Sequence, residues 1–319
     1  MNIYFAPLEG VTDVIYRKVH HDLFTGVDKY FIPFVCPTQH KDFPPREYNA
    51  ILPENNAGIP VVPQILTKYA DHFIWAATEM AEMGYKEVNL NVGCPSGTVT
   101  AKGKGSGMLR DLDWLKAFLD EVYAKCPIPV SIKTRIGFDS VDEWPAILDI
   151  YAQYPVHELI VHARTRNEFY KGVPHAEVCA DVFEKTELPF VYNGELFTPD
   201  ACRQMLERYP GTKALMLGRG MITNPALARE LKGGEKLTLD ELRSFHDRLF
   251  RAYCDKWPAK AILGRMHEIV HYMSCCFEDC SKVRKAIRKA TNLESYEAAA
   301  ERLFDGCEMK AVPCFEWIK

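Results

Sequence analysis

The chain has 319 residues, of which 47% are hydrophobic and 26% are charged. These values are ordinary for a globular protein and exclude a chain that is mainly disordered. Lysine and arginine number 39 and aspartate and glutamate 43, which gives a net charge of −4. Any nucleic acid must therefore be held by a local basic patch and not by a surface that is basic throughout.

The cysteines and the apolar runs indicate the cellular compartment. The eleven cysteines are an odd number in a long chain, and the first residues, Met1 to Pro7, lack the basic and apolar regions of a secretory signal. No apolar run approaches the roughly 18 residues that a membrane span needs. We therefore expect reduced thiols, a cytoplasmic location, and no membrane partner.

Short apolar segments rich in β-branched residues recur along the first three quarters of the chain and predict eight strands. The expected strands are Ile3–Ala6, Tyr30–Val35, Pro60–Leu66, Glu87–Val92, Pro129–Thr134, Glu158–His162, Pro189–Asn193 and Ala214–Gly218.

Segments with helical spacing lie between many of these strands. They are Tyr69–Met83, Trp114–Ala124, Trp144–Tyr154, Ala176–Phe183 and Pro199–Tyr209. Asp111, Asp142 and Thr198 mark helix starts. Eight strands alternating with helices predict an α/β fold, a (β/α)8 TIM barrel. The alternative is an open doubly wound sheet, but the turn after the first strand lacks the glycine-rich dinucleotide motif of that fold.

The strand pattern stops near Lys236, and only helical segments follow. The expected helices are Leu239–Tyr253, Ala259–Met273, Ser281–Thr291 and Tyr296–Phe304. We predict a catalytic barrel domain over residues 1–239 and a smaller all-α domain over residues 240–319.

Polar residues stand at the carboxyl ends of six predicted strands, where barrels of this kind build their active sites. They include Gln64, Asn89, Asn91, Lys133, Arg135, His162, Arg164, Asn193, Glu195 and Arg219. Side chains alternate along a strand, so Asn89 and Asn91 share a face, as do Ser131 and Lys133. The pattern predicts one polar pocket at the mouth of the barrel. Glycine-bearing turns after the last two strands, at Gly194 and Gly218, suit a phosphate group.

The sequence motifs resemble those of the dihydrouridine synthases, flavoenzymes that reduce uridine in transfer RNA. The matching stretches are Ala6 to Asp13, Asn89 to Pro95, Gly105 to Leu109, Ser131 to Gly137, His162 to Arg166, Tyr170 to Gly172, Asn193 to Glu195, and Gly218 to Gly220. The resemblance implies a flavin-binding barrel followed by a helical RNA-binding domain. The Ser96 and Thr98 pattern after Cys94 is similar to the DusC-like branch, which acts on uridine 16.

The resemblance also assigns residues to an FMN cofactor, with NADPH as the reductant. The implied FMN-binding residues are Pro7, Leu8, Glu9, Gln64, Asn91, Lys133, His162, Asn193, Gly194, Glu195, Gly218 and Arg219. The family often has Asp where Glu195 stands, so the contact made by this carboxylate stays open. His162 and Arg164 are expected to contact either the flavin or the uracil edge.

Reducing the uracil C5=C6 bond requires a hydride at C6 and a proton at C5. Reduced FMN delivers a hydride from N5, whereas no amino-acid side chain can. A thiol with an ordinary pKa of about 8.5 is protonated at neutral pH, so Cys94 is the expected general acid. The alternative for Cys94 is a small buried apolar residue, the usual state of a free cysteine. Lys133 would stabilise the anionic reduced flavin.

Transfer RNA is the implied partner, and no obligate protein partner is evident. The expected tRNA-binding residues are Lys102, Arg164, Lys282, Arg284, Lys285, Arg288 and Lys289. Five of these stand on one predicted helix, where residues four apart share a face. A solvated helix face is the alternative reading of that strip.

Two other functions remain open at this stage. One is a flavin-dependent reductase of a free pyrimidine, similar to dihydroorotate dehydrogenase, and the other is a flavin-containing RNA-binding protein without catalysis. We expect no metal site, because His271, Cys275, Cys276 and Cys280 lack the paired spacing of zinc ligands.

Overall fold

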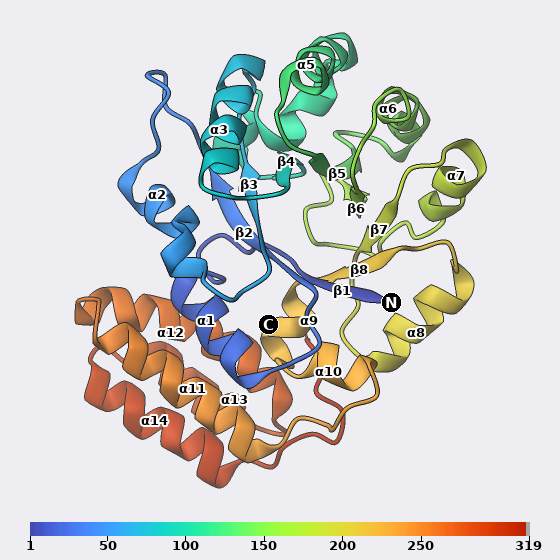
Figure 1. The fold of residues 1–319 in the computed structure, drawn as a ribbon. Coiled ribbons are helices and arrows are strands. Elements are labelled where there is room, and N and C mark those ends of the chain that lie inside the picture. The colour runs from blue at the N-terminus through green and yellow to red at the C-terminus, as the bar shows by residue number, and fades with distance from the viewer. Residues whose placement is uncertain (317–319) are drawn as a thin grey trace. The chain divides into compact units, whose positions relative to one another are not determined.

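The structure is a computed structural model in which residues 1–316 are described. Eight parallel strands close into a barrel in the order β1 to β8 (Figure 1). The strands are β1 (Asn2–Phe5), β2 (Lys29–Val35), β3 (Val61–Ile65), β4 (Val88–Val92), β5 (Val130–Gly137), β6 (Leu159–Thr165), β7 (Phe190–Asn193) and β8 (Ala214–Leu217). The TIM barrel is confirmed, and the open sheet is excluded because the strands close on themselves.

Helices and short turns connect the strands along the chain. They are α2 (Pro45–Ile51), α3 (Ala70–Glu82), α4 (Gly97–Thr100), α5 (Leu112–Lys125), α6 (Trp144–Tyr151), α7 (Val178–Lys185) and α8 (Pro199–Arg208), with 3-10 turns η1 (Pro53–Asn56), η2 (Gly105–Arg110) and η3 (Val141–Glu143). Asp111 caps α5, as expected, by accepting from the Trp114 N–H. Asp142 does not start a helix. It lies within the turn η3, which Ser140 caps through a capping box with Glu143.

The contacts divide the chain into two compact units, which we describe separately. The barrel unit comprises Met1–Pro7, Asp28–Glu195 and Leu206–Met216, and the helical unit comprises Leu8–Val27, Leu196–Met205 and the chain from Leu217 on. The domain division between residues 239 and 240 stays a prediction.

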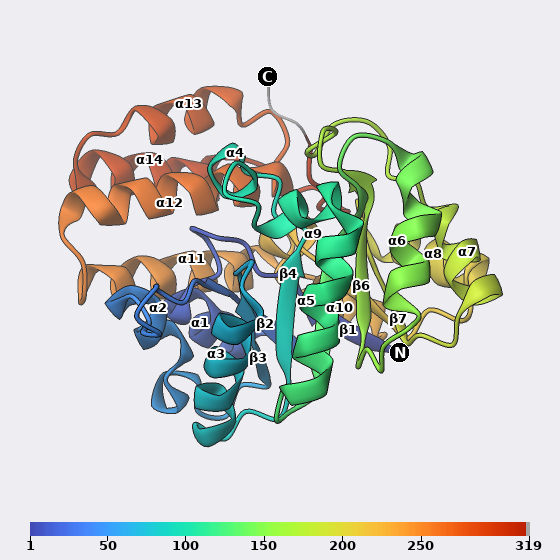
Figure 2. The ribbon, with the colours of Figure 1, turned by 90° about the horizontal axis from the view of Figure 1, so that it is seen from above.

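The helical unit contains the helices that the C-terminal sequence predicts, together with three that it does not. They are α1 (Val14–Leu23), α9 (Arg219–Thr223), α10 (Leu227–Leu231), α11 (Leu239–Cys254), α12 (Ala259–Met273), the turn η4 (Ser274–Cys276), α13 (Ser281–Lys289) and α14 (Leu293–Gly306). Helices α12, α13 and α14 lie side by side (Figure 2). Phe245 of α11 packs edge-on against Tyr16 of α1 and against Phe24, with ring centroids 5.4 and 5.3 Å apart.

A buried cluster of charges lies at the amino ends of the barrel strands. Glu158 is 1% exposed and accepts hydrogen bonds from the Tyr4 hydroxyl at 2.7 Å and from Lys29 Nζ at 2.9 Å. Lys213 Nζ lies 3.2 Å from the same carboxylate, and Lys29 also donates to Glu87 at 2.7 Å. A buried carboxylate is tolerated here because several donors surround it.

Along residues 1–316, no helix combines the length and the apolar character required to cross a membrane.

Candidate active site

The polar strand ends predicted from the sequence meet inside the barrel. The register places Asn89 opposite Ser131, and Asn91 opposite Lys133, on strands β4 and β5. Gln64 of β3 stands opposite Asn89. Gln64, Asn89 and Ser131 are fully buried, so their polar atoms must find partners within the barrel.

These side chains form one hydrogen-bonded interior network in which every donor points the same way. Asn91 Nδ2 donates to Gln64 Oε1 at 2.7 Å, and Gln64 Nε2 donates to Asn89 Oδ1 at 2.7 Å. Asn89 Nδ2 then donates to Ser131 Oγ at 2.9 Å, and Ser131 donates to Glu87 at 2.6 Å. Because the Glu87 carboxylate can only accept, it fixes the orientation of each amide in the network.

The network ends at the loop that carries Cys94. Asn91 Oδ1 accepts from the backbone N–H groups of Gly93, at 3.0 Å, and Cys94, at 2.9 Å. The Cys94 carbonyl oxygen accepts from Ser106 Oγ at 2.8 Å. Gly105, with φ +58°, lets this turn come close, since a Cβ there would lie 2.9 Å from the Cys94 carbonyl oxygen. The backbone of Cys94 is therefore held through both its donor and its acceptor.

Lys133 extends from β5 beside this loop. Its Nζ donates a 2.8 Å hydrogen bond to Asn193 Oδ1, and the Asn193 amide donates to the Met216 carbonyl at 2.8 Å. Removal from water, with a further effect of Arg135, lowers the pKa of Lys133 to about 7, while charge on Cys94 acts in the opposite direction. The hydrogen-bond partner of Lys133 is neutral, so the site favours an additional anionic group near this ammonium.

A guanidinium at the end of β6 holds the following loop in place. Arg164 is fully buried, donates to the carbonyl oxygens of Lys171 at 3.0 Å and Gly172 at 2.6 Å, and lies 2.9 Å from Glu195. Its Nη1 lies 3.3 Å from His162 Nε2. Arg164 therefore uses its donors inside the protein, and its expected contact with tRNA stays a prediction.

Arg135 is a second buried guanidinium that supports the site. Its Nε donates to the Gly93 carbonyl at 2.9 Å, and its Nη1 donates to the Thr165 carbonyl at 2.8 Å. These bonds connect the loops after β4 and β6. The Tyr170 ring lies 5.4 Å from the same guanidinium and 5.8 Å from the His162 ring.

The remaining residues expected to bind FMN, at the first strand end and on the phosphate side, fall in both units. In the barrel unit, Gly194 admits no side chain, because a Cβ would lie 2.3 Å from the Tyr192 hydroxyl. In the helical unit, Leu8 accepts from the N–H groups of Val11 and Thr12, each at 3.0 Å, and Glu9 is exposed. Gly218 caps the short helix α9, and the Arg219 guanidinium lies 4.9 Å from the Phe315 ring.

The basic residues expected to bind tRNA are distributed between the two units. Lys102 is exposed after α4 in the barrel unit. Five more belong to α13 of the helical unit. Arg284 is half-buried there, and the other four are exposed, namely Lys282, Lys285, Arg288 and Lys289.

The cysteines near the end of α12 donate hydrogen bonds from sulfur to backbone carbonyl groups. Cys276 Sγ donates to the Thr223 carbonyl at 2.9 Å, and Cys280 Sγ donates to the Ser274 carbonyl at 3.2 Å. In the described part of the chain, no three His, Cys, Asp or Glu side chains are grouped to hold a metal ion.

The sequence analysis gave no role at the site to Glu87 or Ser106. It placed Asn89, Ser131 and Arg135 at the pocket but did not predict their supporting contacts. For Glu87, Asn89 and Ser131 the signal was present, because a polar residue at an inward position of an apolar strand requires a buried partner. The partner itself is set by strand register, which the sequence does not give.

Solved structures with a similar fold support the barrel architecture. The chain is similar to a variant of NCR from Zymomonas mobilis, with a TM-score of 0.53 and 15% identity over 74% of this chain and 88% of that one. It is also similar to morphinone reductase, with a TM-score of 0.52 and 10% identity over 75% of this chain and 87% of that one. At these identities the likeness establishes the barrel fold alone.

Sequence comparison establishes the family. The dihydrouridine synthase family model matches residues 4–312, and the chain belongs to this family. Two relatives, each 32% identical, are tRNA-dihydrouridine(16) synthases from Pseudomonas putida, covering 78% of this chain and 79% of the relative, and from Escherichia coli, covering 74% and 76%. A probable tRNA-dihydrouridine synthase from Staphylococcus aureus is 30% identical over 78% of this chain and 77% of the relative. The resemblance found in the motifs is confirmed.

Proposed function

We propose that this protein reduces a uridine of tRNA to dihydrouridine, with FMN as cofactor and NADPH as reductant. The observation that carries the proposal is the arrangement around Cys94, in a chain of the dihydrouridine synthase family. The thiol-bearing residue has its backbone held by Asn91 and Ser106, and the half-buried Lys133 interacts electrostatically with it.

The donor set of the barrel unit fits a flavin. Lys133 is an ammonium group whose hydrogen-bond partner is a neutral amide, which suits an anionic ring edge. The amides of Gln64 and Asn91 are used within the interior network, so these two residues support the site from beneath. His162 carries an imidazole, a group of the kind that orients a polar heterocycle. We assign FMN contacts to Pro7, Lys133, His162, Asn193, Gly194 and Glu195. Those of Gln64, Asn91, Leu8, Glu9, Gly218 and Arg219 rest on the resemblance.

When bound and reduced, FMN supplies the hydride for C6 of uracil. The chain supplies the proton: the Cys94 S–H bond breaks as a C5–H bond forms, and the thiolate takes a proton back from water. Lys133 favours negative charge beside the reacting ring, because its ammonium lies in a partly dehydrated site. The interior network keeps the amides of Gln64 and Asn91 in one orientation, so Asn91 always presents its oxygen to the Cys94 loop.

One anaerobic experiment tests the proposal. The purified protein is reduced with NADPH and mixed with tRNA that lacks dihydrouridine or, separately, with free uracil. We expect tRNA, but not free uracil, to reoxidise the flavin, and we expect the tRNA product to contain dihydrouridine. Reoxidation by free uracil would instead indicate a pyrimidine reductase, and binding of tRNA without reoxidation would indicate a non-catalytic RNA-binding protein.

Mapping the modified nucleotide gives the position. We expect position 16, because the pattern after Cys94 is similar to the DusC-like branch and two relatives carry that position in their names. Dihydrouridine at another position would leave the activity in place and contradict the assignment to that branch.

A further inference from the structure

Two polar residues at the carboxyl end of β6 contact each other inside the barrel unit. His162 and Arg164 stand two positions apart, so their side chains share one face of the strand. Both are buried, with 7% and 0% of their surface exposed. Arg164 Nη1 lies 3.3 Å from His162 Nε2, so the guanidinium is hydrogen-bonded to one particular nitrogen of the ring.

The chemistry of the guanidinium decides which atom carries the proton in this contact. Arginine stays charged, offers five N–H donors and has no acceptor, so Arg164 can only donate. His162 Nε2 must therefore be the acceptor and carry no proton. A neutral imidazole whose Nε2 is bare has its single proton on Nδ1, so the contact selects the Nδ1–H tautomer of His162.

Arg164 is held in this position by its other donors. Its Nε donates to the Lys171 carbonyl at 3.0 Å, and its Nη2 donates to the Gly172 carbonyl at 2.6 Å and lies 2.9 Å from Glu195. These three acceptors fix the plane of the guanidinium, so the donor at Nη1 stays directed at His162. A lysine could not make all these contacts together, because its ammonium lacks the planar fork.

The surroundings also oppose a second positive charge on the ring. The register places Arg135 of β5 opposite His162, and the Tyr170 ring lies 5.4 Å from that guanidinium and 5.8 Å from the His162 ring. The nearby carboxylate of Glu195 is already paired with Arg164. Protonating Nε2 would add a cation here and would make two N–H donors face each other.

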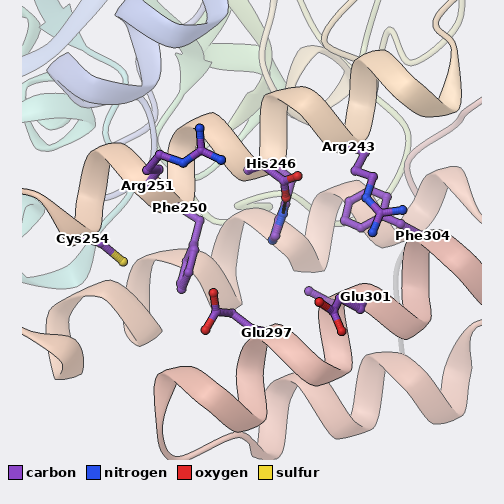
Figure 3. Close-up of a pocket in the computed structure, with 10 residues that line it drawn as sticks. Arg243, His246, Phe250, Arg251, Cys254, Glu297, Glu301 and Phe304 are labelled. Atoms are coloured by element: carbon purple, nitrogen blue, oxygen red, sulfur yellow. Dashed lines mark hydrogen bonds and ion pairs between the residues drawn. The ribbon is translucent and has the colours of Figure 1, made fainter.

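A histidine of the helical unit provides a contrast. His246 of α11 is 4% exposed and lines a pocket of about 420 Å³ (Figure 3). Its Nδ1 lies 2.8 Å from Asp247 Oδ1, and its Nε2 lies 2.8 Å from the Tyr296 hydroxyl oxygen. A carboxylate accepts from an imidazole in either charge state, whereas a guanidinium can donate only to the neutral ring. Arg164 therefore restricts His162 more narrowly than a carboxylate would.

We propose that Arg164 is a positioning residue that fixes His162 as a neutral Nδ1–H imidazole, so that His162 serves the flavin only as a hydrogen-bond donor. The inference rests on the proposed function, because it takes the flavin as the ligand of His162. Its partner on the cofactor must then be an acceptor, such as a carbonyl oxygen or a bare ring nitrogen, and the N3–H group of the flavin is excluded. A neutral imidazole is also a poor proton donor, which leaves the acid role to Cys94.

The test determines the tautomer by NMR. Full-length, flavin-free protein is labelled with ¹⁵N in its histidine rings, and long-range ¹H–¹⁵N correlation shows which ring nitrogens carry a proton. The chain has ten histidines, and the signals absent from His162→Gln identify His162. We expect a proton on Nδ1 and none on Nε2 in the wild type at pH 7, both before and after FMN is added. A proton on Nε2 in either state would overturn the inference, whether or not any variant at position 164 folds.

Two matched variants separate positioning from general support of the loops. Arg164→Met is expected to lose the preference for Nδ1–H, so that Nε2 becomes protonated in a large share of molecules. Arg135→Met removes a second buried guanidinium, whose donors go to the Gly93 and Thr165 carbonyls, and is expected to leave the tautomer of His162 unchanged. The signals of His246 should be the same in both variants as in the wild type. Equal tautomer changes in the two variants, or no change in Arg164→Met, would overturn the inference.

Cofactor and RNA affinities supply a second readout. Arg164→Met is expected to weaken FMN binding about tenfold, the effect of one hydrogen bond that His162 no longer donates in every molecule. The FMN-saturated variant should bind tRNA as the wild type does. A loss of tRNA affinity with an unchanged tautomer and unchanged FMN binding would make Arg164 an RNA contact and would overturn the inference.

The outcomes also separate this inference from the proposed function, because the tautomer is measured without flavin and without turnover. If His162 is an Nδ1–H imidazole but the protein forms no dihydrouridine from tRNA, the proposed function fails and the action of Arg164 on His162 stands. If dihydrouridine forms while Nε2 carries the proton, the proposed function stands and this inference fails.

Discussion

Ser106 donates a 2.8 Å hydrogen bond from its Oγ to the carbonyl oxygen of Cys94. The Ser106 N–H lies 3.2 Å from the same oxygen, and the opposite side of the Cys94 peptide is bound by Asn91. A loop residue is normally mobile, whereas a catalytic group must be held in one position relative to its substrate. Here the position of the thiol-bearing residue is set by two separate segments of the barrel unit, η2 and the end of β4.

The first prediction concerns the thiol itself. Cys94→Ala is expected to keep bound FMN and its reduction by NADPH but to lower dihydrouridine formation about 10²-fold or more, because only the proton donor is lost. Rapid-mixing absorbance and product analysis measure the two steps separately. Cys126→Ala is the matched control, since Cys126 is also half-buried in the barrel unit and its Sγ contacts a backbone carbonyl. Product formation by Cys94→Ala at the wild-type rate would contradict the acid role.

The second prediction concerns the interior network. Ser131→Ala removes the acceptor of Asn89 and one donor of Glu87, so we expect a loss of about 1–3 kcal/mol in the free energy of unfolding. Urea titration measures it. Ser96→Ala, which removes a hydroxyl contact at the surface, is expected to change stability by less than about 0.5 kcal/mol. Equal stability of the two variants would show that the network does not contribute.

The third prediction concerns the pH dependence caused by Lys133. Its pKa is about 7 in the folded protein without flavin and about 10.4 in the unfolded chain. Between these values the unfolded state binds the additional proton, so this residue makes stability rise with pH. Lys133→Met is expected to lack this contribution. In urea titrations of flavin-free protein from pH 7 to pH 9, the wild type should therefore gain stability relative to the variant. A constant difference across this range would contradict the lowered pKa.

The fourth prediction concerns the buried carboxylate at the amino ends of the strands. Burial alone would raise the pKa of Glu158, but hydrogen bonds from Tyr4 and Lys29 outweigh it, and the pKa lies below its ordinary value. The carboxylate therefore stabilises the fold above pH about 4.5, and this contribution declines as the pH falls through the lowered pKa. Glu158→Gln is expected to cost about 3 kcal/mol at pH 7, because Lys213 loses this carboxylate and Lys29 keeps only its bond to Glu87.

The control for that variant is an exposed ion pair. Glu121→Gln breaks a helical contact with Lys125 and is expected to change the free energy of unfolding by less than about 0.5 kcal/mol. The difference in the free energy of unfolding between the wild type and Glu158→Gln should diminish in acid. The difference between the wild type and Glu121→Gln should stay small at every pH. An advantage over Glu158→Gln that persists unchanged to pH 3 would contradict the lowered pKa.

The barrel was predictable because its strands are short, apolar and rich in β-branched residues. All eight strands form where the sequence indicates them, although β5 and β6 extend farther, to Gly137 and Thr165. The extensions carry Arg135 and Arg164, whose charges hide the strand pattern. Both guanidiniums are buried and satisfied by loop carbonyls, which local periodicity does not reveal.

Helix α1 was missed for a related reason. Its buried face includes Arg17 and His20, so the apolar periodicity of a helix is broken. The two side chains are tolerated because Arg17 donates to the Thr12 carbonyl at 2.9 Å and His20 Nε2 lies 3.0 Å from the Pro225 carbonyl. The pairings of the candidate site were hidden in the same way: the sequence shows that Asn89 and Ser131 are polar, but only the register brings them together.

The contact between Phe245 and α1 has a consequence for any attempt to produce the C-terminal helices alone. A recombinant fragment that begins at residue 240 would lack Tyr16 and Phe24, and the aromatic surface of α11 that they cover would face solvent. Such a fragment would self-associate. A truncation that reports faithfully on RNA binding must therefore also supply residues 8–27, for instance by fusing them through a linker to the helices from α9 on.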